Sequence, residues 1–172
     1  DVVGKLESFS RKYSEGKFST LYAIFQLLLY RFTSQTDFIT LFPTADRTRI
    51  EYIEMCGYCV YPLPMKFDSS LTNLSLIELI RKVSEEVLVS MSNQLAIHEI
   101  ISAVDGMERP NIVFALEENK DYLEYLPNEN ICEFDLSCKV TCDKYQNWYI
   151  VIEYNTDKFC KGFIYSFSET YI

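Results

Sequence analysis

The stretch from Thr20 to Arg47, "TLYAIFQLLLYRFTSQTDFITLFPTADR", contains the two elements that decide the fold. Its first part lies in Phe18–Phe32, where apolar residues occupy most faces of a helix, so we expect a helix buried on several sides. A short apolar run, Phe38–Phe42, then predicts a buried strand. We expect the strand to end at Pro43, because proline has no N–H to donate to a strand ladder. The polar corner "PTADR" that follows is the strongest functional clue in the sequence.

The composition predicts a single globular domain, residues 1–172, with an acidic surface. Of its residues 48% are apolar and 15% aromatic, enough to build a core. The net charge of −9 argues against nucleic acid and against anionic membrane surfaces, since both bind basic protein faces. The longest apolar run is shorter than the roughly 20 residues of a membrane span. We therefore expect a cytoplasmic protein, and the absence of an initiator Met favours a piece of a longer chain.

Periodic spacing of apolar residues predicts four more helices. The clearest follows Ser75, which forms a capping box with Glu78 ahead of an apolar stripe. The helix of the opening stretch is expected to begin at Ser19 or Thr20, either of which can cap it. The remaining helices are predicted at Val3–Tyr13, at Ile97–Val104, and starting at Thr156 or Asp157.

Four further runs have strand character. Tyr58–Phe67 contains two prolines, which predicts an edge strand or an extended loop. Residues 134–140 alternate between apolar and polar side chains, which predicts a half-exposed strand that pairs in a hairpin with Trp148–Tyr154. Ile112–Leu116 is a further short strand. The mixture predicts an α/β (α+β) fold in which helices cover one mixed sheet.

The cysteines offer two weak alternatives for chemistry. Cys56 and Cys59 form a C-x-x-C pair, but the sequence after them cannot begin a helix, as a redox pair requires. A zinc site from this pair with Cys138 and Cys142 would need four thiolates in one tetrahedron. Cys138 falls on the apolar side of its strand, so a small buried side chain is favoured and no metal is predicted. Without an export signal, we expect all six cysteines to be reduced thiols.

The single histidine, His98, is the one candidate general base. Glu99 or Asp105 could assist it, but it lies between two isoleucines on a short predicted helix. A surface or packing role is favoured for such a residue. The sequence also has no nucleophile elbow, phosphate-binding glycine loop or H-E-x-x-H motif. We therefore predict no catalytic residue in this chain.

The opening stretch resembles the condensation domains of non-ribosomal peptide synthetases. That family typically has a helix ending Leu-Leu-x-Arg-Tyr-Thr-Gly-Gln, an Asp, a short strand, and Thr-Pro-Val-Ala-Gly-Arg. The matching residues here are Leu28, Leu29, Arg31, Phe32, Thr33, Gln35, Asp37, Pro43, Ala45 and Arg47. Further similar segments follow in the family's order: "GYCVYPLPMK", "LTNLSLIELIRKV", "NQLAIHEII" and "IEYNTDKF". The resemblance thus covers nearly the whole chain.

The resemblance implies one lobe of a two-lobed domain. Each lobe of the family is similar to chloramphenicol acetyltransferase, and a tunnel between the lobes admits the phosphopantetheine arms of two carrier proteins. The family's catalytic His-His-x-x-x-Asp-Gly motif lies in the first lobe and is absent here, so the chain resembles the C-terminal lobe. The implied partners are the N-terminal condensation lobe, peptidyl or aminoacyl carrier proteins and neighbouring synthetase domains. The pantetheine arms are substrates, and no directly bound cofactor is implied.

The resemblance also assigns roles to residues of the polar corner and the strand after it. Arg47 would brace the aspartate of the catalytic motif, since an Arg–carboxylate pair can position the loop that carries the histidine. Pro43, Tyr58 and Tyr61 would line the tunnel. The implied function is to supply tunnel wall and carrier-protein surface for amide bond formation in peptide biosynthesis, without catalysis by this lobe alone. The alternative is a degenerate, non-catalytic docking module in a multidomain synthetase.

Overall fold

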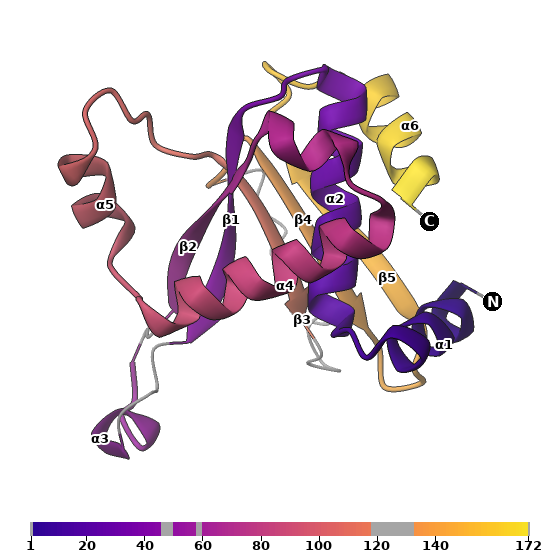
Figure 1. Cartoon of the computed structure of the whole chain (residues 1–172), viewed down its shortest axis with the longest axis horizontal. Coiled ribbons are helices and arrows are strands. Elements are labelled where there is room, and N and C mark those ends of the chain that lie inside the picture. Colours follow the sequence, from indigo (N-terminus) through magenta and orange to yellow (C-terminus); the bar gives the residue numbers. More distant parts are fainter. Residues whose placement is uncertain (1, 46–49, 58–59, 118–132, 172) are drawn as a thin grey trace.

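The computed structural model describes residues 2–45, 50–57, 60–117 and 133–171. The described residues fold into one five-stranded sheet and its helices (Figure 1). The helices are α1 (Val2–Tyr13), α2 (Lys17–Thr33), α3 (Ile50–Ile53), α4 (Leu76–Ser92), α5 (Ile97–Ala103) and α6 (Lys161–Tyr171), with a 3-10 turn at Ser69–Asn73. The strands are β1 (Phe38–Ala45), β2 (Val60–Phe67), β3 (Ile112–Glu117), β4 (Leu136–Cys142) and β5 (Trp148–Tyr154).

The sheet is mixed, as predicted, with strand order β2-β1-β3-β4-β5. β1 pairs antiparallel with β2 over its full length, and β4 pairs antiparallel with β5 in the predicted hairpin. β3 runs parallel to both of its neighbours. Its register with β4 is continuous, whereas it meets β1 through a single bridge at Leu41 and Val113. The sheet is therefore weakly joined between β1 and β3.

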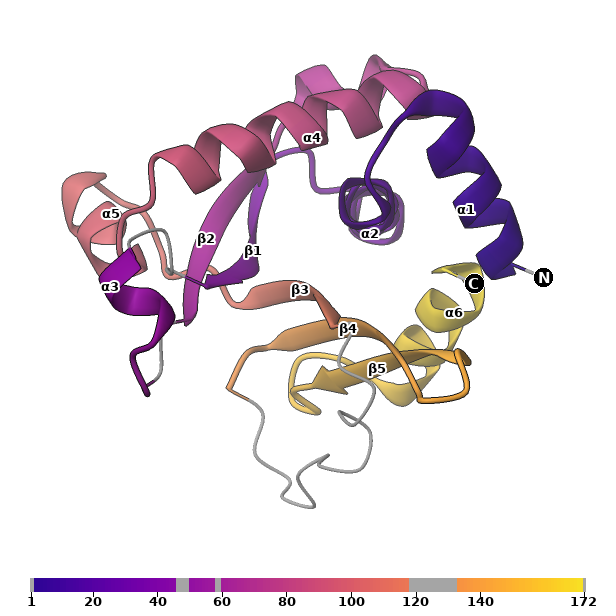
Figure 2. The same ribbon diagram turned by 90° about the horizontal axis from the view of Figure 1, so that it is seen from below.

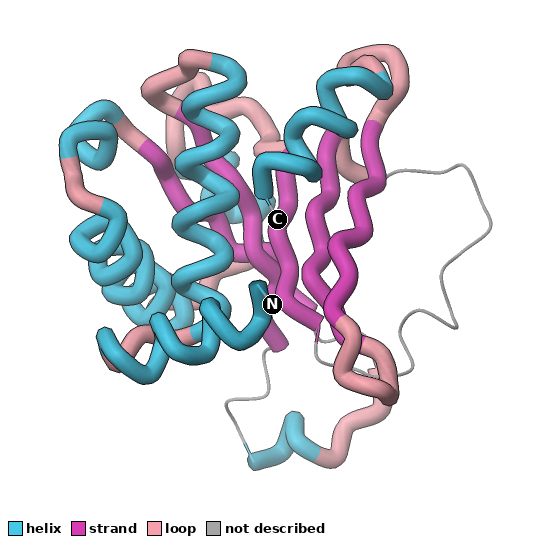
Figure 3. Tube along the Cα trace, turned by 90° about the vertical axis from the view of Figure 1, so that its right-hand side faces the viewer, coloured by secondary structure: helices cyan, strands magenta, loops and turns pink. Residues whose placement is uncertain are grey.

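Four helices form a layer on one face of the sheet. Figure 2 shows α1, α2, α4 and α6 on the same side of the strands, and Figure 3 shows the helices in front of the sheet. α2 contacts α4, α6 and β3, as expected of a helix buried on several sides. The core between the layers is aromatic, and its largest fully buried rings are Tyr22, Phe25, Phe42, Phe67, Phe114 and Phe167. We call this side of the sheet the helix face.

α2 begins earlier than predicted. Its N-cap is Gly16, which makes no side-chain cap hydrogen bond, so the expectation of a cap at Ser19 or Thr20 was wrong. Both residues lie in the first turn instead, where Thr20 Oγ1 donates to the Gly16 carbonyl at 2.9 Å. The capping box of α4 is confirmed: Ser75 Oγ accepts from Glu78 N–H, and the Glu78 carboxylate accepts from Ser75 N–H.

β1 continues through Pro43 to Ala45, so the prediction that the proline ends the strand was wrong. The physical reason is the register, in which Pro43 lies opposite Pro62 of β2. Neither proline has an N–H to donate to the other. The β1–β2 ladder loses no hydrogen bond where the two proline nitrogens point away from each other. On the β3 side β1 is bridged only at Leu41, so Pro43 removes no donor from a continuous ladder there. β2 is an edge strand, as its prolines predicted.

Two predictions near the C-terminus also need correction. β4 is buried on both faces, with only Lys139 partly exposed, because it is a central strand between β3 and β5 rather than a half-exposed one. α6 begins at Lys161 and not at Thr156 or Asp157. Asn155 holds those residues in a turn, since its side chain accepts from Asp157 N–H and its carbonyl accepts from Phe159 N–H, each at 2.9 Å.

Candidate functional site

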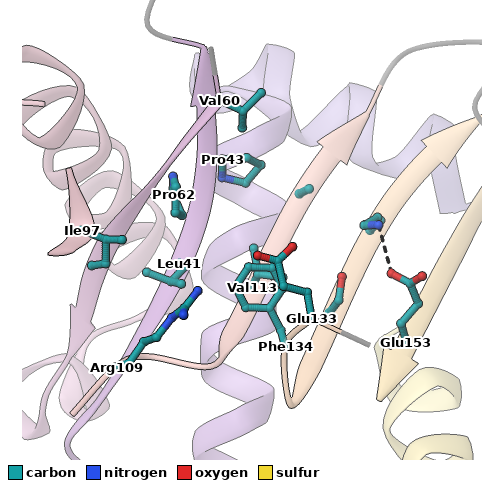
Figure 4. Close-up of a pocket in the computed structure, with 13 residues that line it drawn as sticks. Leu41, Pro43, Val60, Pro62, Ile97, Arg109, Val113, Glu133, Phe134 and Glu153 are labelled. Carbon is teal, nitrogen blue, oxygen red and sulfur yellow. Dashed lines mark hydrogen bonds and ion pairs between the residues drawn. The ribbon is translucent and has the colours of Figure 1, made fainter. Parts of the chain in front are cut away.

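A pocket of about 480 Å³ lies on the sheet face opposite the helix layer. We call this side of the sheet the pocket face (Figure 4). Strand alternation explains which residues reach it, because every second side chain of a strand points to the same face. The pocket is lined by Leu41, Pro43, Val60, Pro62, Ile97, Arg109, Val113, Ala115, Glu133, Phe134, Ser137, Lys139 and Glu153.

One half of the pocket wall is apolar and built mainly from β1, β2 and β3. The facing pair Pro43 and Pro62 forms its outer part, and Leu41 and Val113 form its floor. Leu41 and Val113 are almost completely buried, with exposed fractions of 1% and 6%. The two floor residues sit at the single bridge that joins β1 to β3, so this wall lies where the two parts of the sheet meet.

The other half of the wall is polar and comes from β4 and β5. Lys139 Nζ and Glu153 Oε2 form an ion pair at 2.9 Å, drawn as a dashed line in Figure 4. Ser137 lies two residues before Lys139 on β4 and directly opposite Glu153 in the register. Arg109 extends toward Leu41 from the segment before β3. The pocket thus offers hydrocarbon contact on one side and hydrogen-bonding groups on the other.

The described cysteines and the single histidine are not among the residues that line this pocket. His98 is exposed on α5 and is not among the lining residues. Cys138 is fully buried on the helix face, where burial raises the pKa of its thiol to about 12 and disfavours a thiolate ligand. Cys56 is exposed, and Cys59 lies outside the described residues. Within the described part of the chain no group of three or more metal-ligating side chains comes together.

Two of the four predicted site residues can be located. Pro43 lines the pocket. Tyr61 lies between Val60 and Pro62 on β2 and therefore projects from the opposite face, the face of Leu63. The structure does not bring Pro43 and Tyr61 together, and a tunnel-lining role for Tyr61 stays a prediction. Arg47 and Tyr58 lie outside the described residues.

The polar half of the pocket was missed by sequence reasoning. Ser137 and Lys139 were recognised as the polar alternates of a strand, and that pattern was interpreted as solvent exposure. The signal that could have identified them is the parallel pairing of β4 with β3, which makes β4 central. A strand in parallel pairing is commonly covered on both faces, so polar residues on such a strand do not by themselves indicate a solvated edge. Such pairing is a long-range property that local patterns do not reveal.

No helix in the described part of the chain is both long enough and apolar enough to cross a membrane.

Known proteins resemble this chain in sequence and in fold. One linear gramicidin synthase protein of Brevibacillus parabrevis is 30% identical over 178 residues, covering 92% of this chain and 2% of that protein. A second protein of the same synthase is 28% identical over 160 residues, covering 89% of this chain and 3% of that protein. The chain thus spans only a few per cent of the length of these curated relatives.

The fold is shared with a solved condensation domain. The condensation domain from Monacolin K polyketide synthase MokA superposes with a TM-score of 0.81 at 16% identity. The match covers 99% of this chain and 43% of that one. The model of the family described as "Condensation domain" matches residues 1–172. Since that match extends over the entire sequence, the chain belongs to the condensation domain family.

Proposed function

We propose that this chain is the C-terminal lobe of a condensation domain in a non-ribosomal peptide synthetase. Its pocket face forms part of the wall of a tunnel in which an amide bond forms between two thioester-tethered substrates. The observation that carries the proposal is the pocket itself, which lies on the sheet face opposite the helix layer in a chain of this family. The 43% coverage of a solved condensation domain leaves room in that chain for a second lobe, which this proposal sets against the pocket face.

The reaction explains why such a wall is useful. An acceptor amine attacks the carbonyl carbon of a donor thioester, a C–N bond forms, and the C–S bond breaks to release the thiol. The amine must lose a proton to a base, and positioning the two reactants supplies much of the rate. The apolar half of the pocket can hold the substrates in place and exclude water. Since His98 is exposed and does not line the pocket, the base in this proposal comes from the N-terminal lobe.

The partners follow from the same proposal. Two carrier proteins would deliver the substrates on phosphopantetheine arms, and this lobe would provide part of the surface against which they dock. Arg47 would act as a positioning residue, bracing the aspartate of the catalytic motif on the other lobe. The neighbouring domains of the synthetase would complete the assembly.

The test compares this chain alone with the same chain joined to an N-terminal lobe that carries His-His-x-x-x-Asp-Gly. Both proteins are incubated with an aminoacyl carrier protein as donor and another as acceptor, and the dipeptidyl carrier protein is measured by intact mass. We expect product only from the two-lobed protein. The matched control is His98→Ala in the two-lobed protein, which should leave the rate unchanged because His98 is exposed on α5.

Three results would contradict the proposal. Product formation by this chain alone would show that it holds its own catalytic groups. Loss of product in His98→Ala would place the base on α5. If the two-lobed protein bound carrier proteins but formed no amide with any donor, the docking-module function would replace the proposed one.

A further inference from the structure

Ser137 carries a hydroxyl group on the pocket face that has no hydrogen-bond partner among the described residues. Ser137 on β4 is 97% buried, since its exposed fraction is 3%, and it lines the pocket. Its Oγ is fully buried and neither donates to nor accepts from any described residue. A buried hydroxyl without a partner costs folding free energy, so such a group in a pocket indicates a partner supplied by a ligand.

The side chains beside Ser137 do not provide a partner for its hydroxyl group. Val113 on β3 and Glu153 on β5 lie beside it in the register. Val113 offers only hydrocarbon, and Oε2 of Glu153 accepts from Lys139 Nζ. The adjacent charges therefore compensate each other, and the hydroxyl faces a site with little net charge. Such a site favours a neutral hydrogen-bonding group over an isolated ion, because an uncompensated charge is costly to bury.

We propose that Ser137 is a specificity-determining residue whose hydroxyl donates a hydrogen bond to an amide carbonyl of a ligand lying across β3 and β4, with the ligand's apolar part against Leu41, Pro43 and Val113. This inference rests on the proposed function, in which the tunnel holds amide-containing chains. The carbonyl could belong to the pantetheine arm or to the acyl chain, and the hydroxyl recognises the same chemistry in either.

Thr141 provides a matched control on the same strand. It projects from the same face as Ser137, is fully buried, and its Oγ1 also has no hydrogen-bond partner among the described residues. It is not one of the residues that line the pocket. Removing either hydroxyl should therefore affect folding in the same direction, whereas only the Ser137 change should affect binding.

The experiment titrates the full chain with two probes and follows the methyl NMR signals of Val113 and Ala115, both of which line the pocket. Pantetheine supplies the amides of the arm, and N-acetyl-leucinamide supplies those of an acyl chain. We expect Ser137→Ala to weaken binding of at least one probe by about 3- to 10-fold, the effect of one lost hydrogen bond. The probe that loses affinity identifies the source of the carbonyl. Thr141→Val should leave both affinities unchanged.

Urea unfolding supplies a readout that separates binding from a structural role. Both variants should keep or raise the unfolding midpoint, because each removes an unpaired buried hydroxyl. The proposal is overturned if Ser137→Ala binds both probes like the wild type, if wild type binds neither probe, or if the variant unfolds at clearly lower urea. Failure of the two-lobed protein to form amides would overturn the proposed function without changing these binding results.

Discussion

The two faces of the sheet use side chains in opposite ways. On the helix face, Tyr22, Phe25 and Phe114 are fully buried and pack ring to ring at centroid distances of 5.2–5.3 Å. On the pocket face the strands present prolines, a serine and the Lys139–Glu153 ion pair around an open space. The difference teaches that one face specifies the fold and the other is available for a ligand or partner, although both are built from alternate residues of the same strands.

The largest expected effect is a difference in unfolding free energy between substitutions of two adjacent β3 residues whose side chains point to opposite faces. Phe114→Ala on the helix face should cost about 3–5 kcal/mol of unfolding free energy, since it leaves a cavity among Tyr22, Phe25 and Phe18. Val113→Ala on the pocket face should cost only about 1.5 kcal/mol, the loss of two methyl-sized groups. Urea unfolding measures both. Equal losses would mean that the two faces do not differ in this way.

A polar cluster inside the helix face should give the next largest effect. Thr40 Oγ1 hydrogen-bonds Tyr22 Oη at 2.7 Å and accepts from Gln26 Nε2 at 3.0 Å, and all three residues are buried. Thr40→Val keeps the shape but leaves two buried groups without partners, which should cost about 3 kcal/mol in urea unfolding. Thr44→Val, on the same strand and face, is the control and should cost less. A Thr40→Val protein as stable as the wild type would show that the cluster contributes nothing.

The polar corner should affect catalysis rather than stability. In the two-lobed protein, Arg47→Ala should lower kcat for amide formation by about 10- to 100-fold, the contribution of one charge-assisted hydrogen bond. KM should change little, because in the proposed role the residue acts on the catalytic loop and not on substrate. The rate loss should not add to that of a substitution of the catalytic-motif aspartate. Additive losses would show that the two residues act independently.

The smallest effect concerns the pH dependence of stability. The Asp135 carboxylate, just before β4, accepts from Lys158 Nζ at 2.6 Å, and this contact lowers the pKa of Asp135 below its ordinary value of 3.8. A lowered pKa in the folded state stabilises the protein above the ordinary value, and that stabilisation is lost as pH falls through the lower one. Asp135→Asn should therefore flatten the decline of stability below about pH 4 in urea unfolding series. Parallel curves for the two proteins would contradict this.

The helix face was largely predictable from sequence, whereas the pocket face was not. The sequence located α2 because apolar residues occupy most of its faces, and α4 because a capping box precedes an apolar stripe. The continuation of β1 through Pro43 could not be predicted. It depends on the residue opposite, Pro62, which is distant in the sequence. The burial of Ser137 was not predicted for a related reason. It follows from the central position of β4 in the sheet, which is set by strand pairing and not by the local sequence.

The resemblance predicted the family, and the family match over residues 1–172 confirms it. The resemblance could not indicate which side chains share a face of the sheet. Two of its motif residues, Pro43 and Tyr61, are not partners in the β1–β2 register but are offset by one residue. Pro43 lies opposite Pro62, so Tyr61 projects away from it. Strand alternation is a physical constraint that a set of matched motifs does not contain.

The most direct test of the proposed tunnel wall compares Val60→Trp with Tyr61→Trp in the two-lobed protein. These neighbours on β2 are equally exposed, at 38% and 39%, but Val60 lines the pocket and Tyr61 projects from the other face. The rate of amide formation between carrier-bound substrates is measured by intact mass for both. From the faces that the two side chains occupy, we predict that Val60→Trp slows the reaction and Tyr61→Trp leaves it unchanged, so the comparison also tests the tunnel-lining role that the sequence predicted for Tyr61. The reverse result would contradict the claim that the pocket face forms the tunnel wall.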